Sequence, residues 1–136
     1  MPRDPRAWLA DIVAACDLLI EFTRGKTFTD YAADPLLRSA VERQFEIAGE
    51  ALRVTLQHRP ELAGNITDTR AIIAFRNQLT HAYSAVDHGT VWGLLERRVP
   101  QLTRITRDEI LREYSYLLTP RWGPRQKASG WRPQRS

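Results

Sequence analysis

Four side chains with useful chemistry fall within eight residues near the middle of the chain: Arg76, Asn77, His81 and Tyr83. An imidazole has an ordinary pKa of about 6.5, so His81 can take up or release a proton near neutral pH. The guanidinium of Arg76 can bind a phosphate through two parallel hydrogen bonds and offset negative charge on a pentacoordinate intermediate. In RNA the ribose 2′-hydroxyl supplies the nucleophile, so cleavage needs a base, an acid and an anion-binding group but no metal. The segment therefore suits phosphodiester chemistry.

The spacing of these residues raises a geometric problem. On one helix Asn77 and His81 are four residues apart and share a face, whereas Arg76 and Tyr83 share a second face. Arg76 and His81 lie about 140° apart around an ideal helix axis. One helix alone would struggle to direct both groups at one atom. A second copy of the segment across a two-fold axis, or a distorted final turn, would bring them together.

Structural explanations of the same residues stay open at this stage. Arginine, asparagine and histidine near a helix C-terminus also complement the helix dipole and bind the last carbonyl groups. A paired-carboxylate site is possible at Glu46 and Glu50, but these two also suit a solvated helix face. Cys16 falls in an apolar helical pattern, which is typical of core packing rather than of a redox or catalytic thiol.

Apolar residues recur at three- and four-residue steps, which predicts helices that place the segment 76–83 in an all-α chain. Asp-Pro pairs, which combine an N-cap with a proline at the first helical position, mark two helix starts. The expected helices begin at Asp4-Pro5, Asp34-Pro35, Asp68 and close to Val91. The expected loops are 27–33, 60–67 and 84–89, and Pro100 indicates either a kink or the start of a fifth helix. The predicted architecture is an up-and-down bundle of four main helices.

At 136 residues the chain fits one domain, which we expect to span residues 1–119. Residues 120–136 are rich in proline, glycine, serine and arginine and predict an irregular basic arm. Residues 115–136 hold five basic residues and no acidic one, so they carry +5 while the rest of the chain carries −1. Such an arm can bind RNA or an acidic partner, or it can be a solvated end.

The other sequence features exclude several classes of protein. A single cysteine cannot form an intrachain disulfide, which fits a cytoplasmic protein. The apolar stretch 8–22 is interrupted by Asp11, Asp17 and Glu21, so we expect neither a membrane span nor a signal peptide. No cysteine and histidine spacing fits zinc, and no glycine motif for a nucleotide phosphate is present. We therefore expect no metal and no cofactor.

The string of residues 76–83, R-N-Q-L-T-H-A-Y, resembles the R-N-x-L-x-H-x-Y motif of the HepT toxins, a branch of the HEPN superfamily. Residues 40–51 resemble the second helix of that family, with its A-V-E-R and I-G-E-A pattern, and Val86-Asp87 and Val91-Trp92 resemble the segment that follows the motif. The resemblance covers roughly residues 5–114.

This resemblance implies a HEPN-like helical bundle that forms a homodimer and places two copies of the motif in one cleft. It implies a metal-independent RNase, the toxin of a type VII-like toxin–antitoxin system. Arg76 and His81 would be catalytic, Asn77 would assist, and Glu50 would hold Arg76 from the adjacent helix. The antitoxin would be a minimal nucleotidyltransferase (MNT) that attaches AMP to Tyr83 and so places a bulky anion in the RNA site.

Two alternatives to this interpretation remain. The chain could be a non-cleaving module that docks a nucleotidyltransferase or a nucleotide, with Arg76 and His81 only binding phosphate. It could also be a plain structural bundle in which both residues stabilise a helix end.

Overall fold

The computed structural model describes residues 5–64, 69–81 and 86–118, without the side chains of residues 5, 63, 64, 69, 81 and 113–118. The elements in order are α1 (Pro5–Thr23), α2 (Phe28–Ala33), α3 (Pro35–His58), the 3₁₀ turn η1 (Pro60–Gly64), α4 (Thr69–His81), α5 (His88–Arg97) and α6 (Val99–Leu118). No strand occurs in these residues. The expected all-α bundle is confirmed.

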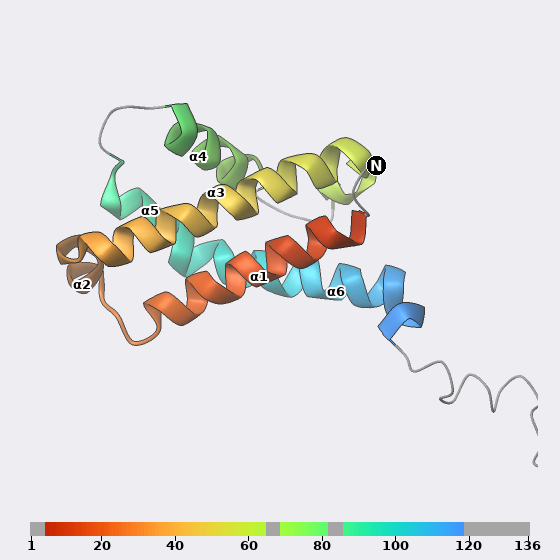
Figure 1. Ribbon diagram of the computed structural model, residues 1–136, viewed down its shortest axis with the longest axis horizontal. Coiled ribbons are helices and arrows are strands. Elements are labelled where there is room, and N and C mark those ends of the chain that lie inside the picture. The colour runs from red at the N-terminus through yellow and green to blue at the C-terminus, as the bar shows by residue number, and fades with distance from the viewer. Residues whose placement is uncertain (1–4, 65–68, 82–85, 119–136) are drawn as a thin grey trace, which may run out of the picture.

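Helices α1 and α3 run side by side along the length of the bundle, and the other helices pack around this pair (Figure 1). Helix α6 lies against α1, and α4 lies against α3 on the opposite side of the molecule. Helix α5 contacts α6 and the short helix α2. Because α4 packs chiefly on α3, the residues of α3 determine how the segment that starts at Arg76 is held.

The core is built from the apolar rows that the sequence predicts. Helix α1 buries Leu9, Ile12 and Leu19, and α3 buries Phe45 and Leu52, each 1% exposed or less. Burial of one such side chain contributes about 1.5–3 kcal/mol of hydrophobic free energy. The row of buried residues therefore fixes α1 and α3 against each other and provides a rigid base for α4.

The start of α3 follows the predicted pattern. The side chain of Asp34 accepts hydrogen bonds from the backbone N–H groups of Leu36 and Leu37, both at 3.1 Å, and Pro35 occupies the first helical position. Proline is tolerated there because the N–H that it lacks has no partner within the helix. The predicted caps Asp4 and Asp68, by contrast, lie outside the described residues.

The expectation of a loop over 27–33 is wrong, because this segment contains α2. Thr27 Oγ1 accepts a hydrogen bond from the backbone N–H of Asp30 at 3.1 Å, and the Asp30 carboxylate accepts one from the N–H of Thr27 at 2.9 Å. This reciprocal capping box stabilises a helix too short to show apolar periodicity. Tyr31 anchors α2, since its side chain is fully buried in the core.

The expected fourth helix is two helices, and the first of them begins earlier than predicted. Helix α5 already begins at His88, because Asp87 accepts hydrogen bonds from the N–H and the hydroxyl of Thr90 at 3.0 and 2.7 Å. Helix α6 begins at Val99, so Pro100 stands in its first turn, where its missing N–H costs little. For Pro100 we expected either a kink or the start of a further helix, and the structure shows the start of a further helix.

Two further sequence-based expectations concern the C-terminal arm and membrane-spanning helices. The basic arm over residues 120–136 lies outside the described residues, so the boundary between residues 1–119 and the arm stays a prediction. Among the described helices, none is both long and apolar enough to cross a membrane.

Candidate active site

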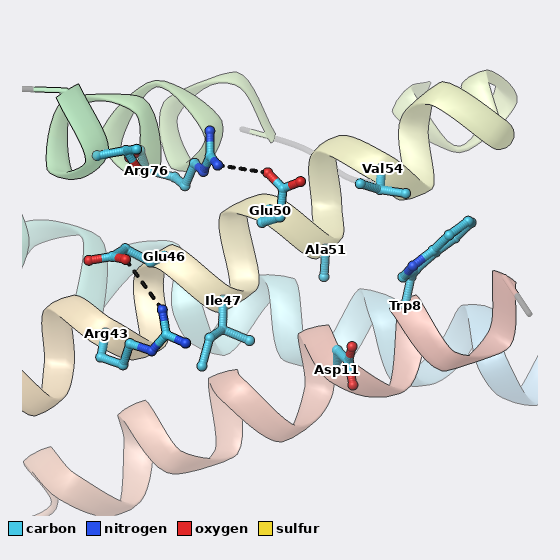
Figure 2. Close-up of a pocket in the computed structure, with 10 residues that line it drawn as sticks. Trp8, Asp11, Arg43, Glu46, Ile47, Glu50, Ala51, Val54 and Arg76 are labelled. Carbon is cyan, nitrogen blue, oxygen red and sulfur yellow. Dashed lines mark hydrogen bonds and ion pairs between the residues drawn. The ribbon is translucent and has the colours of Figure 1, made fainter. Parts of the chain in front are cut away.

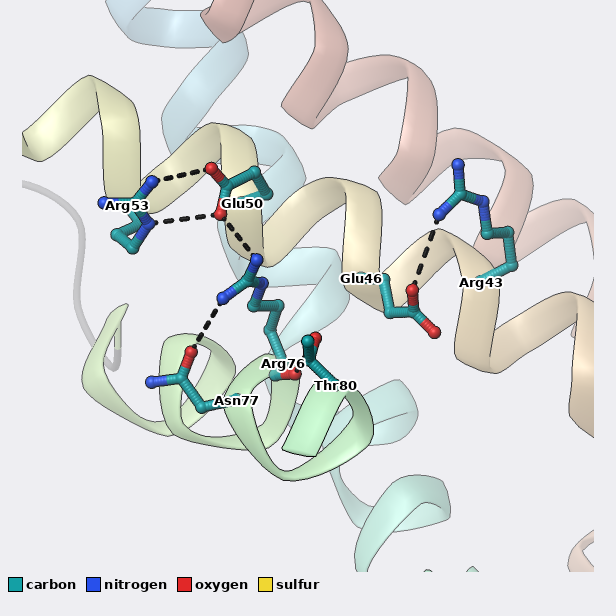
Figure 3. A network of polar contacts seen from close by, with 7 residues as sticks. All are labelled: Arg43, Glu46, Glu50, Arg53, Arg76, Asn77 and Thr80. Carbon is teal, nitrogen blue, oxygen red and sulfur yellow. Dashed lines mark hydrogen bonds and ion pairs between the residues drawn. The ribbon is translucent and has the colours of Figure 1, made fainter. Parts of the chain in front are cut away.

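Arg76 lies in the middle of α4 and points toward α3. Its Nη2 atom lies 3.0 Å from Oε2 of Glu50 on α3, and its Nη1 atom donates a hydrogen bond to Oδ1 of Asn77 at 3.0 Å (Figure 3). The side chain is 22% exposed. The guanidinium is therefore held from two sides but remains within reach of a ligand from solvent.

These contacts argue against the simplest structural explanation of Arg76. A residue that caps a helix end binds the last carbonyl groups of its own helix. Arg76 instead turns to a carboxylate on the neighbouring helix. The contact between Glu50 and Arg76 that the family resemblance implies is thus present, although the catalytic role of Arg76 and the supporting role of Glu50 stay predictions.

Gly49 explains why α4 can approach α3 so closely at this point. A Cβ atom at position 49 would lie 2.4 Å from Cβ and 2.9 Å from Cγ of Arg76, distances that real Cβ atoms do not adopt. Gly49 is itself buried within a long helix, where glycine costs about 1 kcal/mol relative to alanine. The sequence analysis used this residue only as part of a family pattern. A glycine in the middle of a predicted helix is a signal of close packing that could have identified it.

Arg53 completes the site, and the sequence analysis did not single it out. Its Nε and Nη2 atoms donate to Oε2 and Oε1 of Glu50 at 3.1 and 2.7 Å, a bidentate pair. One carboxylate therefore holds two guanidinium groups, one from its own helix and one from α4 (Figure 3). The cluster of Glu50, Arg53 and Arg76 carries a net charge of +1, which suits a phosphate ligand.

The surroundings of Glu50 suit it to hold arginine side chains rather than to donate or accept a proton. The hydrogen bonds from Arg53, followed by the positive charges of Arg53 and Arg76, lower the pKa of the Glu50 carboxyl group. A carboxylate with a lowered pKa is a poor general base near neutral pH. Glu46 is likewise paired with an arginine, Arg43, at 3.4 Å. These pairings do not favour the paired-carboxylate alternative.

Arg76 and Glu50 lie along a groove of about 430 Å³ between α1, α3 and α4 (Figure 2). The groove is lined by Trp8, Asp11, Arg43, Glu46, Ile47, Glu50, Ala51, Val54, Arg76 and Thr80. Within the described ranges, no three His, Cys, Asp or Glu side chains are grouped so that they could hold a metal ion. The groove thus offers guanidinium groups, carboxylates and an apolar strip to a ligand.

The remaining predicted site residues lie at the end of α4. Asn77 is exposed on the helix surface, and His81 is the last helical residue, so position 81 lies about 140° around the axis from Arg76. The side chain of His81 and the whole of Tyr83 lie outside the described residues. The structure therefore brings Arg76, Asn77 and Glu50 together within one chain, and the geometric problem of Arg76 and His81 persists in α4.

Comparison with known proteins gives a consistent set of relatives. The family model described as ribonuclease HepT-like matches residues 12–109. A probable ribonuclease HepT from Thermococcus cleftensis is 34% identical over 102 residues, which cover 75% of this chain and 92% of the relative. A candidate RNase from Methanocaldococcus jannaschii is 30% identical over 102 residues, 75% of this chain and 93% of the relative. Another candidate RNase, from Caldanaerobacter subterraneus subsp. tengcongensis, is 29% identical over 111 residues, 82% of this chain and 98% of the relative. No solved structure matches the chain.

Proposed function

The chain belongs to the ribonuclease HepT-like family, and from this premise we propose that it is a metal-independent endoribonuclease, the toxin of a type VII-like toxin–antitoxin system. The observation that carries this proposal is the guanidinium of Arg76, which Glu50 holds at 3.0 Å beside a groove open to solvent. An arginine fixed in this way is preorganised to bind a phosphate, because little side-chain freedom is lost when the ligand arrives.

The proposed reaction is an attack by the ribose 2′-oxygen on the adjacent phosphorus. His81 removes the 2′-hydroxyl proton, the new P–O bond forms, and the bond from phosphorus to the 5′-oxygen breaks. The departing oxygen takes a proton from a second imidazole, so the products carry a 2′,3′-cyclic phosphate and a 5′-hydroxyl. Arg76 stabilises the extra negative charge on the phosphorane oxygens, and Asn77 orients the groups around it.

The second imidazole comes from a second subunit in this proposal. Position 81 is turned about 140° from Arg76 on one α4, so a single chain does not direct both groups at one linkage. The side of α4 that carries Ala74, Asn77 and Gln78 is exposed, which leaves room for another α4. A symmetric homodimer that pairs these surfaces would supply two copies of Arg76 and His81 to one cytoplasmic RNA substrate.

Inactivation would follow from modification of Tyr83, two residues beyond the end of α4. An MNT-type nucleotidyltransferase antitoxin would transfer AMP to the phenol oxygen and release pyrophosphate from ATP. The added phosphate is an anion, and in this proposal it competes with RNA for the guanidinium of Arg76. Mass spectrometry of the protein co-expressed with the antitoxin would show one added AMP on the peptide that contains Tyr83.

The direct test is cleavage of RNA by the purified protein in excess EDTA. We expect products with 2′,3′-cyclic phosphate ends from the wild type, and no cleavage above background from His81→Ala with an unchanged helical circular dichroism spectrum. Cleavage that persists in His81→Ala would overturn the role of His81. RNA binding without any product would support the alternative of a non-cleaving module instead.

A further inference from the structure

Beyond Arg76, the groove leads to an aromatic side chain that the proposed reaction does not use. Trp8 of α1 lines the same groove as Arg76 (Figure 2). The ring centroid of His58 lies 4.5 Å from that of Trp8, with 43° between the ring planes. Because the imidazole supports the indole from one side, Trp8 is held in place while part of its surface borders the groove.

Apart from Arg76 and Trp8, the wall of the groove is partly apolar and partly charged. Ile47, Ala51 and Val54 of α3 supply the apolar strip, while Asp11 and Glu46 supply carboxylates. Arg43 also lines the groove and pairs with Glu46 at 3.4 Å, so Arg43, Glu46 and Asp11 together bring no excess of positive charge that would attract a second phosphate. An uncharged planar group with donors on its edge suits both the apolar strip and the carboxylates.

We propose that this groove binds one unpaired nucleobase of the RNA, next to the linkage whose phosphate sits at Arg76. The base stacks on Trp8, an interaction available to every base because each has a π-face. The groove volume of about 430 Å³ lies within the usual range for small-molecule sites, roughly 300–1,000 Å³. This inference rests on the proposed RNase function and deepens it, since it assigns a single-stranded substrate and a subsite for it.

Trp8 precedes the part of the chain that the family model matches. The family model begins its match at residue 12, four positions further along α1. A base-binding residue at such a position would set substrate preference without altering the catalytic groups.

The test is a double-mutant cycle between Trp8 and the base. Short single-stranded RNAs are compared that differ only by an abasic nucleotide on the 5′ or the 3′ side of the cleaved linkage. For wild type we expect loss of the base on one of these sides to lower kcat/KM by about five- to 150-fold, the effect of 1–3 kcal/mol of stacking. On the intact RNA, the kcat/KM of Trp8→Ala should be lower than that of wild type by this same factor. On that abasic RNA, the kcat/KM of Trp8→Ala should fall no further. Trp8→Phe should retain most of the difference in kcat/KM between the intact and the abasic RNA.

A purely structural role for Trp8 gives a different pattern. Trp8→Ala would then lower cleavage of intact and abasic RNA by the same factor, and this result would overturn the inference. Trp92→Leu is the matched control, because Trp92 packs on Tyr31 with 5.6 Å between ring centroids and does not line the groove. Trp92→Leu should change kcat/KM by the same factor for the intact and the abasic RNAs. If Trp8→Ala does not fold, Trp8→Leu, which keeps an apolar side chain, replaces it in the cycle.

The subsite and the nuclease activity can fail separately. If wild type cleaves no RNA, the proposed function fails, and the same cycle is then run on binding. The ligands are RNAs with a 2′-deoxy nucleotide at the linkage, with and without the base. A base-dependent affinity that Trp8→Ala abolishes supports the subsite, and an affinity indifferent to the base overturns it.

Discussion

The carboxylate of Glu50 on α3 and the guanidinium of Arg76 on α4 meet at 3.0 Å, next to the close approach of the two helices at Gly49. This contact links the long central helix of the bundle to the motif at the end of α4. Arg53 binds the same carboxylate from the far side, so Glu50 is itself fixed. Arg76 is thus positioned by Glu50 and Arg53, and we do not expect either of these two residues to touch the reacting atoms.

Replacement of Glu50 tests that positioning role. Glu50→Gln keeps the size of the side chain but removes the charge that holds Arg76, and hydrogen bonds to charged groups are worth about 1.5–3 kcal/mol. We expect kcat for RNA cleavage to fall at least about tenfold. The melting temperature should change little, because an ion pair whose acid is 41% exposed contributes about 1 kcal/mol or less.

Glu21→Gln serves as the matched control for Glu50→Gln. It breaks an exposed ion pair with Arg24, 2.9 Å long, at the other end of α1 from the groove. We expect this variant to cleave RNA at the wild-type rate. If both variants lose activity equally, or if neither loses any, Glu50 does not position Arg76.

A methyl group at Gly49 should push α4 away from α3. In Gly49→Ala the new Cβ would lie 2.4 Å from Cβ of Arg76, and overpacking of this kind costs about 1–3 kcal/mol. Urea unfolding should show this loss, together with a loss of RNA cleavage because Arg76 moves. Gly93→Ala is the matched control, since a Cβ there meets nothing within 4 Å. It should be neutral or stabilise α5 by up to about 1 kcal/mol. Equal stabilities of the two variants would contradict the close approach.

The stability provided by Glu50 should depend on pH with a defined sign. Its pKa in the folded protein is lowered below the ordinary value of about 4.3, mainly by the hydrogen bonds from Arg53. A group with a lowered pKa stabilises the fold above its unfolded pKa, and this contribution is lost as the pH falls through the folded pKa. The difference in unfolding free energy between wild type and Glu50→Gln should therefore be constant from pH 8 to about 5 and should shrink in more acidic solution. Urea titrations across this range measure it, and a difference that grows toward acid pH would be inconsistent with the ion pairs.

Cys16 should be inert in the folded protein. Its side chain is fully buried, and burial raises the pKa of the thiol to about 11. Few molecules carry the reactive thiolate at pH 8. Iodoacetamide should label the native protein far more slowly than free glutathione, and 6 M guanidinium chloride should restore the rate. Rapid labelling of the folded protein would reopen a redox role.

Local patterns were enough to predict some elements but not others. The Asp34-Pro35 pair predicts the start of α3, because both the cap and the proline act within one helical turn. The six residues of α2 escape such reasoning, since they are too few for a 3.6-residue period and depend on the buried ring of Tyr31. Periodicity also could not separate α5 from α6, because apolar residues continue on both sides of the break.

The site was predictable only in part, for a related reason. The spacing within residues 76–83 placed Arg76, Asn77 and His81 on one helix, as the structure has them. The approach of α4 to Gly49 and the bond from Arg53 to Glu50 depend on how helices pack, which no single-helix pattern contains. A charged residue on a helix face looks the same in sequence whether it is solvated or, like Arg53, paired with a site carboxylate.

The central claim is that two subunits supply their His81 imidazoles to one RNA linkage, and subunit mixing tests it most directly. Wild-type and His81→Ala subunits are mixed in equal amounts, allowed to exchange, and assayed on RNA in EDTA. If both imidazoles are needed in one site, only dimers of two wild-type subunits cleave, and about a quarter of the activity of an equal concentration of wild type remains. Retention of about half of that activity would mean that each chain acts alone and would contradict the account.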